Sequence, residues 1–239
     1  MSSESATSTT TQVLDVHQLR RLWKPHKQRL LDAQPGHPAH VRFHRACSWL
    51  QSVEKMVDDV NYDHALISQW IAFNALYGQW DARAHEPVAD RECWRVFVDR
   101  IVDLDKEQIV VAMLRTNRGL VLSLLDDEYL SGYFWKDPCK EQAGRARKTK
   151  FKGQSWFVEG SWKLMLEQLL ERVYLMRCQL VHGAATHGSQ LNRRSLKHCS
   201  VMMGHLLPAM LQVWISHGAD EDWGVMCYPP ITARPGKPK

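Results

Sequence analysis

The sequence predicts an all-α protein, an antiparallel helical bundle formed by a single domain. Apolar residues recur at three- and four-residue intervals over most of the chain, which is the period of a helix with one buried face. No segment alternates apolar and polar residues for long enough to predict a strand. The 239 residues are 44% hydrophobic and 24% charged, which excludes the disordered and collagen-like classes. We therefore expect one helical domain, or one domain with appendages.

Proline and glycine divide the first part of the chain. Residues 1–11 are almost all Ser, Thr, Glu and Ala, too poor in apolar groups to offset the entropy of ordering, so we expect a disordered arm. Residues 12–33 have an apolar period that predicts a helix broken near Pro25. The turn signal in residues 35–38, Pro-Gly-His-Pro, separates this helix from the next.

The later helices follow from the same period, and the densest apolar segment, residues 63–80, should lie in the core. Two pieces are expected to be irregular: a basic loop over residues 137–153 and a Pro-rich tail over residues 218–239. The domain then covers residues 12–217, with its core in 41–217. The expected helices are residues 41–60, 63–80, 90–105, 106–115, 120–130, 154–181 and 191–217, the last with a kink at Pro208.

Cysteine usage and hydropathy indicate a compartment. The six cysteines lie far apart with no C-x-x-C pair, which argues against a zinc ribbon and against a disulfide framework. No run approaches the roughly 18 apolar residues of a membrane helix, and the N-terminal residues do not resemble a signal peptide. We expect reduced thiols in a soluble, cytoplasmic protein that does not enter a membrane.

Positive charge is concentrated in the expected basic loop. Its residues 140–152 contain six basic side chains and one acid, a net charge of +5 that equals the formal charge of the whole chain. Phe151 and Trp156 are interleaved with the cations, so the loop could bind RNA through phosphate contacts and base stacking, or could simply be a solvated loop. The candidate nucleic-acid-binding residues are Lys140, Arg145, Arg147, Lys148, Lys150 and Lys152.

Other chemistries have little support. Cys178 and His182, or His198, Cys199 and His205, could be imagined as a mixed metal site, but no recognised ligand spacing supports one. Gly-rich nucleotide loops and a G-x-S-x-G elbow are absent from the sequence. We expect neither a metal nor another cofactor.

The remaining candidate is an Arg-x4-His pattern near the end of the longest expected helix, Arg177 and His182, followed by Gly183 as a helix stop. The pattern occurs three times, at positions 21/26, 177/182 and 193/198, so context must choose among them. The pair Arg177 and His182 ends an amphipathic helix, and an Arg that lies beside a core needs a partner or a function to offset the cost of burying its charge. A His at a helix C-terminus is favoured as the imidazolium, which suits a proton donor to a leaving group.

Geometry limits what this pair can do within one chain. Five residues rotate an ideal helix by about 140°, so Arg177 and His182 do not share one face. They could converge on one phosphate through a distorted last turn or through a second copy of the motif. We therefore expect a homodimer.

Three segments carry a family resemblance: ISQWIAFNALYGQW in residues 67–80, LRTNRGLVLSLLDDEYLSGYFW in residues 114–135, and RCQLVHG in residues 177–183. With them the chain resembles the HEPN superfamily, helical domains known for an R-x4-6-H motif, in its larger, Apea-like form. The resemblance spans roughly residues 41–217. It implies a helical bundle that commonly dimerises around a shared cleft, which in active members is a metal-independent endoribonuclease site of toxins, phage-defence effectors or RNA-processing proteins.

By this resemblance, Arg177 would hold the scissile phosphate and His182 would act as general acid/base for attack by the ribose 2′-hydroxyl. Many active members carry a polar residue directly after the Arg, where this chain has Cys178. Other members are inactive modules that bind a nucleotide, RNA or a protein, which is the alternative function for this chain. A toxin would imply an antitoxin or another regulatory partner.

Two further polar residues are candidates for a supporting role. Asn74 falls on an otherwise apolar stripe, where an unpaired amide would cost about 1 to 3 kcal/mol, so it must have a partner. That partner is either the backbone of a neighbouring helix or the pair Arg177 and His182. Tyr174, one turn before Arg177, either packs or assists in the same way.

Overall fold

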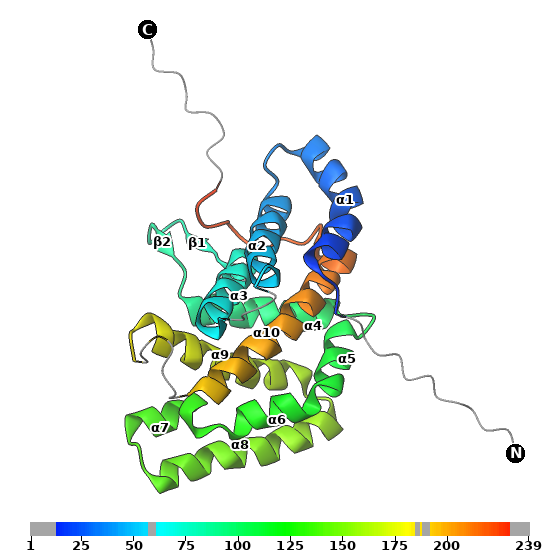
Figure 1. Ribbon diagram of the computed structural model, residues 1–239. Coiled ribbons are helices and arrows are strands. Elements are labelled where there is room, and N and C mark those ends of the chain that lie inside the picture. Colours follow the sequence, from blue (N-terminus) through cyan, green and yellow to red (C-terminus); the bar gives the residue numbers. More distant parts are fainter. Residues whose placement is uncertain (1–12, 57–60, 185–186, 188–191, 230–239) are drawn as a thin grey trace, which may run out of the picture.

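The computed structural model describes residues 13–56, 61–184, 187 and 192–229. Over these residues the protein is mostly helical, which confirms the all-α prediction (Figure 1). The helices are α1 (Val16–Ala33), α2 (Pro38–Glu54), α3 (Tyr62–Tyr77), α4 (Asp90–Leu104), α5 (Ile109–Thr116), α6 (Arg118–Asp126), α7 (Gly132–Lys136), α8 (Lys140–Glu159), α9 (Trp162–Val181) and α10 (Arg193–Val213). A 3-10 turn (Glu128–Leu130) precedes α7, and a π-helical turn (Trp214–Gly218) extends α10.

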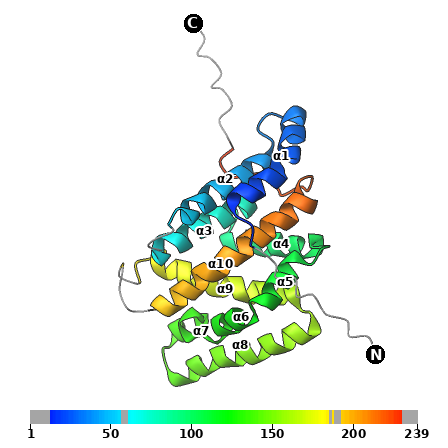
Figure 2. The same cartoon turned by 45° about the vertical axis from the view of Figure 1, so that its right-hand side comes forward.

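Helix α10 is the central element of the fold. It contacts α3, α5, α6 and α9, and in both views α1, α2 and α3 lie on one side of it while α6, α7 and α8 lie on the other (Figures 1 and 2). The segment Arg193–Gly218 is long and apolar enough to cross a membrane, but 72% of its most apolar stretch is buried inside the protein. Such burial is typical of a core helix.

A small hairpin is the only sheet among the described residues. Strands β1 (Trp80–Asp81) and β2 (Glu86–Pro87) pair antiparallel between α3 and α4. Each strand has two residues, too few for an alternating pattern to show in the sequence. The expected end of the α3 helix, residue 80, is therefore three residues too late.

The first helix is continuous through Pro25, so the predicted break is wrong. Proline removes one helical hydrogen bond, but the buried side chains Leu19, Trp23 and Leu30 hold the helix against the core on both sides of it. A capping box at Asp15 and Gln18 also fixes the first turn. Tertiary packing therefore outweighs the local cost of the proline.

The predicted basic loop is wrong as well, because most of residues 137–153 lies in helix α8. Lys, Arg, Gln, Ala and Glu are good helix formers, so the stretch is helical although it contains two glycines. Gly153 is needed for packing: an added Cβ there would come within 2.6 Å of Leu125 Cδ1. The true stop is Gly160, which has a left-handed backbone with φ of 72°, so the single helix expected over 154–181 is divided between α8 and α9.

The first part of the predicted tail packs onto the core. Trp223 is buried and stacks on Trp214 with ring centroids 4.3 Å apart, and its indole N–H donates to Gly218 O at 2.8 Å. The folded body therefore includes residues 218–229, beyond the expected boundary at 217. The expected arm, residues 1–11, and the Pro-rich end, residues 230–239, lie outside the described residues.

Candidate functional site

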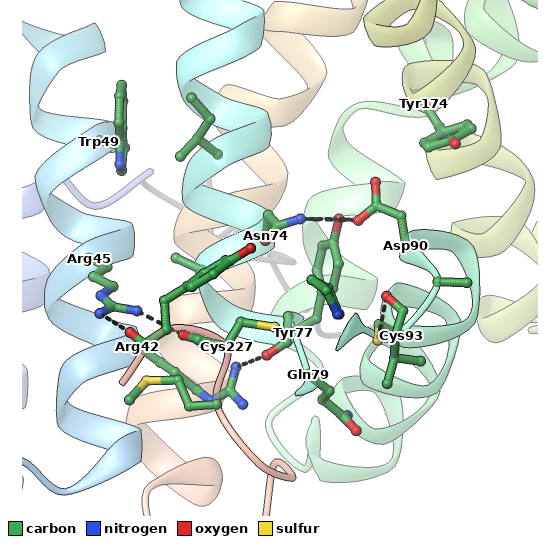
Figure 3. A pocket seen from close by; sticks show the side chains of 18 of the residues that line it. Arg42, Arg45, Trp49, Asn74, Tyr77, Gln79, Asp90, Cys93, Tyr174 and Cys227 are labelled. Atoms are coloured by element: carbon green, nitrogen blue, oxygen red, sulfur yellow. Dashed lines mark hydrogen bonds between the residues drawn. The ribbon is translucent and has the colours of Figure 1, made fainter. Parts of the chain in front are cut away.

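A cleft of about 660 Å³ opens between α2, α3, α9, the segment before α4, and the C-terminal segment (Figure 3). Arg177, Asn74 and Tyr174 line this cleft, so the structure brings together three residues that the sequence singled out. Two further arginines, Arg42 and Arg45, lie on the α2 side, and Asp90 is the one acid among the lining residues. The cleft is therefore cationic.

A hydrogen-bonded network crosses the cleft wall between α3 and α4. The Tyr77 hydroxyl donates to Asp90 Oδ1 at 2.6 Å, and Asn74 Nδ2 donates to the same oxygen at 3.0 Å (Figure 3). Asn74 and Tyr77 are one helical turn apart, which places both beside the first residue of α4. Burial, and then the Asp90 carboxylate, raises the pKa of the Tyr77 hydroxyl, so it remains a donor at neutral pH.

Asn74 thus has the partner that its position requires, but the partner is neither of those expected. It bonds to a side chain of α4 and to Tyr77, and no hydrogen bond joins it to Arg177 or His182. The amide therefore positions Asp90, which faces the same cleft as Arg177.

Helix α9 contributes an aromatic ring that lies close to two guanidinium groups. The Cζ atom of Arg91 lies 4.8 Å from the Tyr174 ring centroid, and that of Arg177 lies 5.9 Å from it. Trp70 packs at 5.7 Å from the same ring, so Tyr174 both packs and faces the cleft. Burial raises the pKa of the Tyr174 hydroxyl.

Arg177 is half-buried and makes no ion pair with the described residues. Its one polar contact is a 4.0 Å approach of Nη1 to Cys178 Sγ, at the outer limit for a sulfur hydrogen bond. Cys178 is a free, half-exposed thiol outside the cleft lining. A half-buried guanidinium whose positive charge is balanced by no acidic side chain in contact with it is suited to an anionic ligand.

His182 lies apart from the cleft. It caps the C-terminus of α9 and is exposed, and its backbone N–H donates to Cys178 O at 2.9 Å. Gly183 follows with φ of 68°, which confirms the expected helix stop. Within one chain the structure therefore brings Arg177, but not His182, to the cleft.

The sequence analysis missed a clamp on α2, in which Arg42 and Arg45 hold the C-terminal segment through hydrogen bonds. Arg42 is 1% exposed and donates four hydrogen bonds to the carbonyl oxygens of Leu76, Gly78, Trp223 and Gly224. Burial lowers its pKa to about 10, which still leaves it charged at neutral pH. The available signal was the helical spacing of Arg42 from Ala39 and Ala46, which places an arginine on a buried face.

Arg45 extends this clamp to the surface by donating to Cys227 O at 3.2 Å and Tyr228 O at 2.6 Å (Figure 3). Trp49 and Tyr228, 42% and 70% exposed, flank it on the cleft rim. Exposed aromatic faces beside arginines are typical of surfaces that stack nucleobases.

The six cations predicted to bind nucleic acid lie on α8 and do not line the cleft. Lys150 Nζ is paired with Asp126 Oδ2 at 3.0 Å, and Arg145 approaches Glu141 at 3.9 Å. The others are exposed: Lys140, Arg147, Lys148 and Lys152. As a helix rather than a loop, α8 presents these charges on a fixed surface.

The structure also separates the three Arg-x4-His pairs. Arg193 forms an ion pair with the nearly buried Asp63, which makes it structural, and His26 stacks on Trp23 within α1. Over the described part of the chain, no three His, Cys, Asp or Glu side chains converge as metal ligands.

Comparisons of this chain with known protein families, with curated proteins and with solved structures found no match.

Proposed function

We propose that this protein is a HEPN-like, metal-independent endoribonuclease. The observation that carries the proposal is the placement of Arg177, half-buried without an ion-pair partner among the described residues, on the wall of a cationic cleft and one turn before the end of α9. The exposed aromatic residues Trp49 and Tyr228 provide stacking surfaces for bases in the same cleft.

The chemistry assigns one step to each side chain. His182 removes the proton of a ribose 2′-hydroxyl, whose oxygen attacks the adjacent phosphorus, and Arg177 stabilises the negative charge that develops on the phosphoryl oxygens. The bond from phosphorus to the 5′-oxygen breaks, and the protonated His182 gives its proton to that leaving oxygen. The products are a 2′,3′-cyclic phosphate and a 5′-hydroxyl, so the substrate is RNA rather than DNA.

The position of His182 outside the cleft is accounted for by a homodimer. A partner copy that places its α9 end against the cleft would supply the imidazole that this chain's own cleft lacks. We propose that each site combines Arg177 of one protomer with His182 of the other.

The first test is cleavage of a mixed RNA pool in EDTA by the wild type and by folded Arg177→Ala and His182→Ala variants. Each substitution should reduce cleavage by at least about 100-fold, as removal of transition-state stabilisation does. Arg83→Ala is the matched control, because Arg83 is exposed and its guanidinium makes no hydrogen bond or ion pair with the described residues. Cleavage that requires a metal, or that persists in both variants, would overturn the proposal.

Mixing the two inactive variants tests the shared site. Random exchange makes half of the dimers mixed, and each mixed dimer has one intact site of two, so about a quarter of the wild-type activity should return. No recovery from dimers shown to exchange would place both residues in one chain.

A second candidate is an inactive HEPN-like module that binds a nucleotide, RNA or a protein. The exclusion of His182 from the cleft lining favours it, as does the thiol of Cys178 after the motif arginine. Such a module would raise its melting temperature with nucleotide or RNA and leave the RNA intact.

For the active enzyme, we propose a toxin or phage-defence role controlled by an antitoxin or another regulatory protein. Expression of the wild type should arrest growth, and His182→Ala should abolish the arrest. Equal toxicity of the two forms would exclude this role.

A further inference from the structure

A second concave surface, separate from the cleft, lies between α1 and α2. It is a groove of about 410 Å³ whose lining contains four cations, Arg20, Arg21, Lys24 and Lys27, and no acid. Arg20 donates to Gln51 Oε1 at 3.0 Å, a neutral partner that leaves its charge uncompensated. The other three cations form no hydrogen bond or ion pair with the described residues.

The cations form a linear array. Arg20, Lys24 and Lys27 are spaced by four and three residues, which places them on one face of α1 over about 10 Å. This length exceeds a single phosphate group and suits successive phosphates of a chain. A tight cluster, in contrast, would suit one phosphate.

The floor of the groove is aromatic. Trp23 and Phe43 are buried and stacked with ring centroids 4.5 Å apart. The Trp23 indole N–H donates to His40 Nδ1 at 3.1 Å, which requires that nitrogen to be unprotonated and places the ring proton of neutral His40 on Nε2. His40 is therefore a further hydrogen-bond donor of fixed tautomer on the groove wall.

The groove and the cleft share one helix. His40, Phe43 and His44 of α2 line the groove, whereas Arg42, Arg45 and Trp49 of the same helix line the cleft (Figure 3). His44 of the groove is followed directly by Arg45 of the cleft, and consecutive residues of a helix lie about 100° apart around its axis. A strand that crosses α2 at this point would contact both.

We propose that the α1–α2 groove is an exosite that binds the phosphate backbone of single-stranded RNA and leads the strand across α2 into the cleft. The inference rests on the proposed function only in naming RNA as the ligand. It assigns to the groove a role that is distinct from bond cleavage: affinity and positioning without sequence preference.

The test measures the binding of a labelled oligouridine of about 12 nucleotides to two full-length proteins. The parent protein carries His182→Ala, and the groove variant carries Arg21→Gln/Lys24→Gln/Lys27→Gln in addition. The matched control removes three exposed cations outside the groove, Lys106→Gln/Arg115→Gln/Arg118→Gln. Each phosphate contact to a single strand contributes about 0.7 to the slope of log K against log salt, so the groove variant should lose about 2 from that slope and the control should lose none. Affinity at low salt should fall at least about tenfold in the groove variant alone.

Further measurements distinguish the remaining outcomes. RNA should protect Lys24 and Lys27 from acetylation, and ATP at equal phosphate concentration should not displace the strand. Equal slopes in the groove and control variants, displacement by ATP, or no RNA binding by the parent chain would overturn the exosite. Loss of binding in the groove variant of a protein whose wild type cleaves no RNA would support the exosite and overturn only the ribonuclease. Cleavage of RNA by the wild type, together with normal RNA binding by the groove variant, would support the ribonuclease and overturn only the exosite.

Discussion

The cleft and the α1–α2 groove are both cationic, but their arginines and lysines are used differently. In the cleft, Arg42 and Arg45 donate to backbone carbonyl groups and hold the C-terminal segment in place. In the groove, Arg21, Lys24 and Lys27 have no partner among the described residues. A positive charge in this protein can therefore be a structural element or an available binding group, and only its hydrogen bonds distinguish the two.

The largest loss of stability is expected when the buried arginine of the cleft is replaced. Arg42→Met removes four hydrogen bonds and leaves two buried carbonyl groups unpaired at about 1 to 3 kcal/mol each, so the free energy of unfolding should fall by about 3 to 5 kcal/mol. Thermal unfolding should show a melting temperature lower by roughly 10 °C. Arg45→Met is the control, because its partners lie nearer the surface and the loss should be about 1 kcal/mol or less. Equal losses in the two variants would contradict a structural role specific to Arg42.

A smaller effect is expected in the network around Asp90. Tyr77→Phe removes a buried hydroxyl that donates to a carboxylate, which should cost about 1.5 to 3 kcal/mol in urea unfolding. Tyr133→Phe removes an exposed hydroxyl and should stay within about 0.5 kcal/mol of the wild type. A Tyr77→Phe variant as stable as Tyr133→Phe would mean that water replaces the hydroxyl in the network.

The groove should show a pH dependence of stability. Burial, and then the charge of Lys27 and of two neighbouring histidines, lowers the pKa of His40 below 6.5. A lowered histidine pKa means that the folded state favours the neutral ring, so this contribution is present above pH 6.5 and is lost as the pH falls below 6.5. His40→Asn keeps an acceptor for the Trp23 indole without a titration.

Urea unfolding between pH 7.5 and 5.5 checks this point. The wild type should lose more stability than His40→Asn over that interval. Parallel curves would show that His40 is not responsible.

The smallest effect on stability is expected from the charges that have no partner. Arg21→Gln/Lys24→Gln/Lys27→Gln should leave the free energy of unfolding within about 0.5 kcal/mol of the wild type, or raise it slightly because repulsion between neighbouring cations is relieved. Circular dichroism melts in low salt measure this change. A large loss would show that these side chains support the fold, and would remove the contrast with the cleft.

The helical class was determined by the sequence alone, because the three- and four-residue apolar period recurs in nearly every segment and needs no knowledge of neighbours. The same holds for the stop at Gly183, which depends on a local backbone conformation. The candidate residues Arg177, Asn74 and Tyr174 were also found in this way, since polar groups on apolar helix faces are visible in the sequence.

Only the tertiary structure decided the rest. Pro25 is a local helix breaker, and contacts of the buried side chains on both sides of it outweighed its cost. Helical spacing places Arg42 on a buried face, but its partners at residues 223 and 224 are far away in the sequence, so only the tertiary structure shows what it binds. Helix geometry alone places Arg177 and His182 on different faces of α9, but the packing around α9 decided that Arg177 is the one that faces the cleft, because that packing fixes which side of the helix is covered.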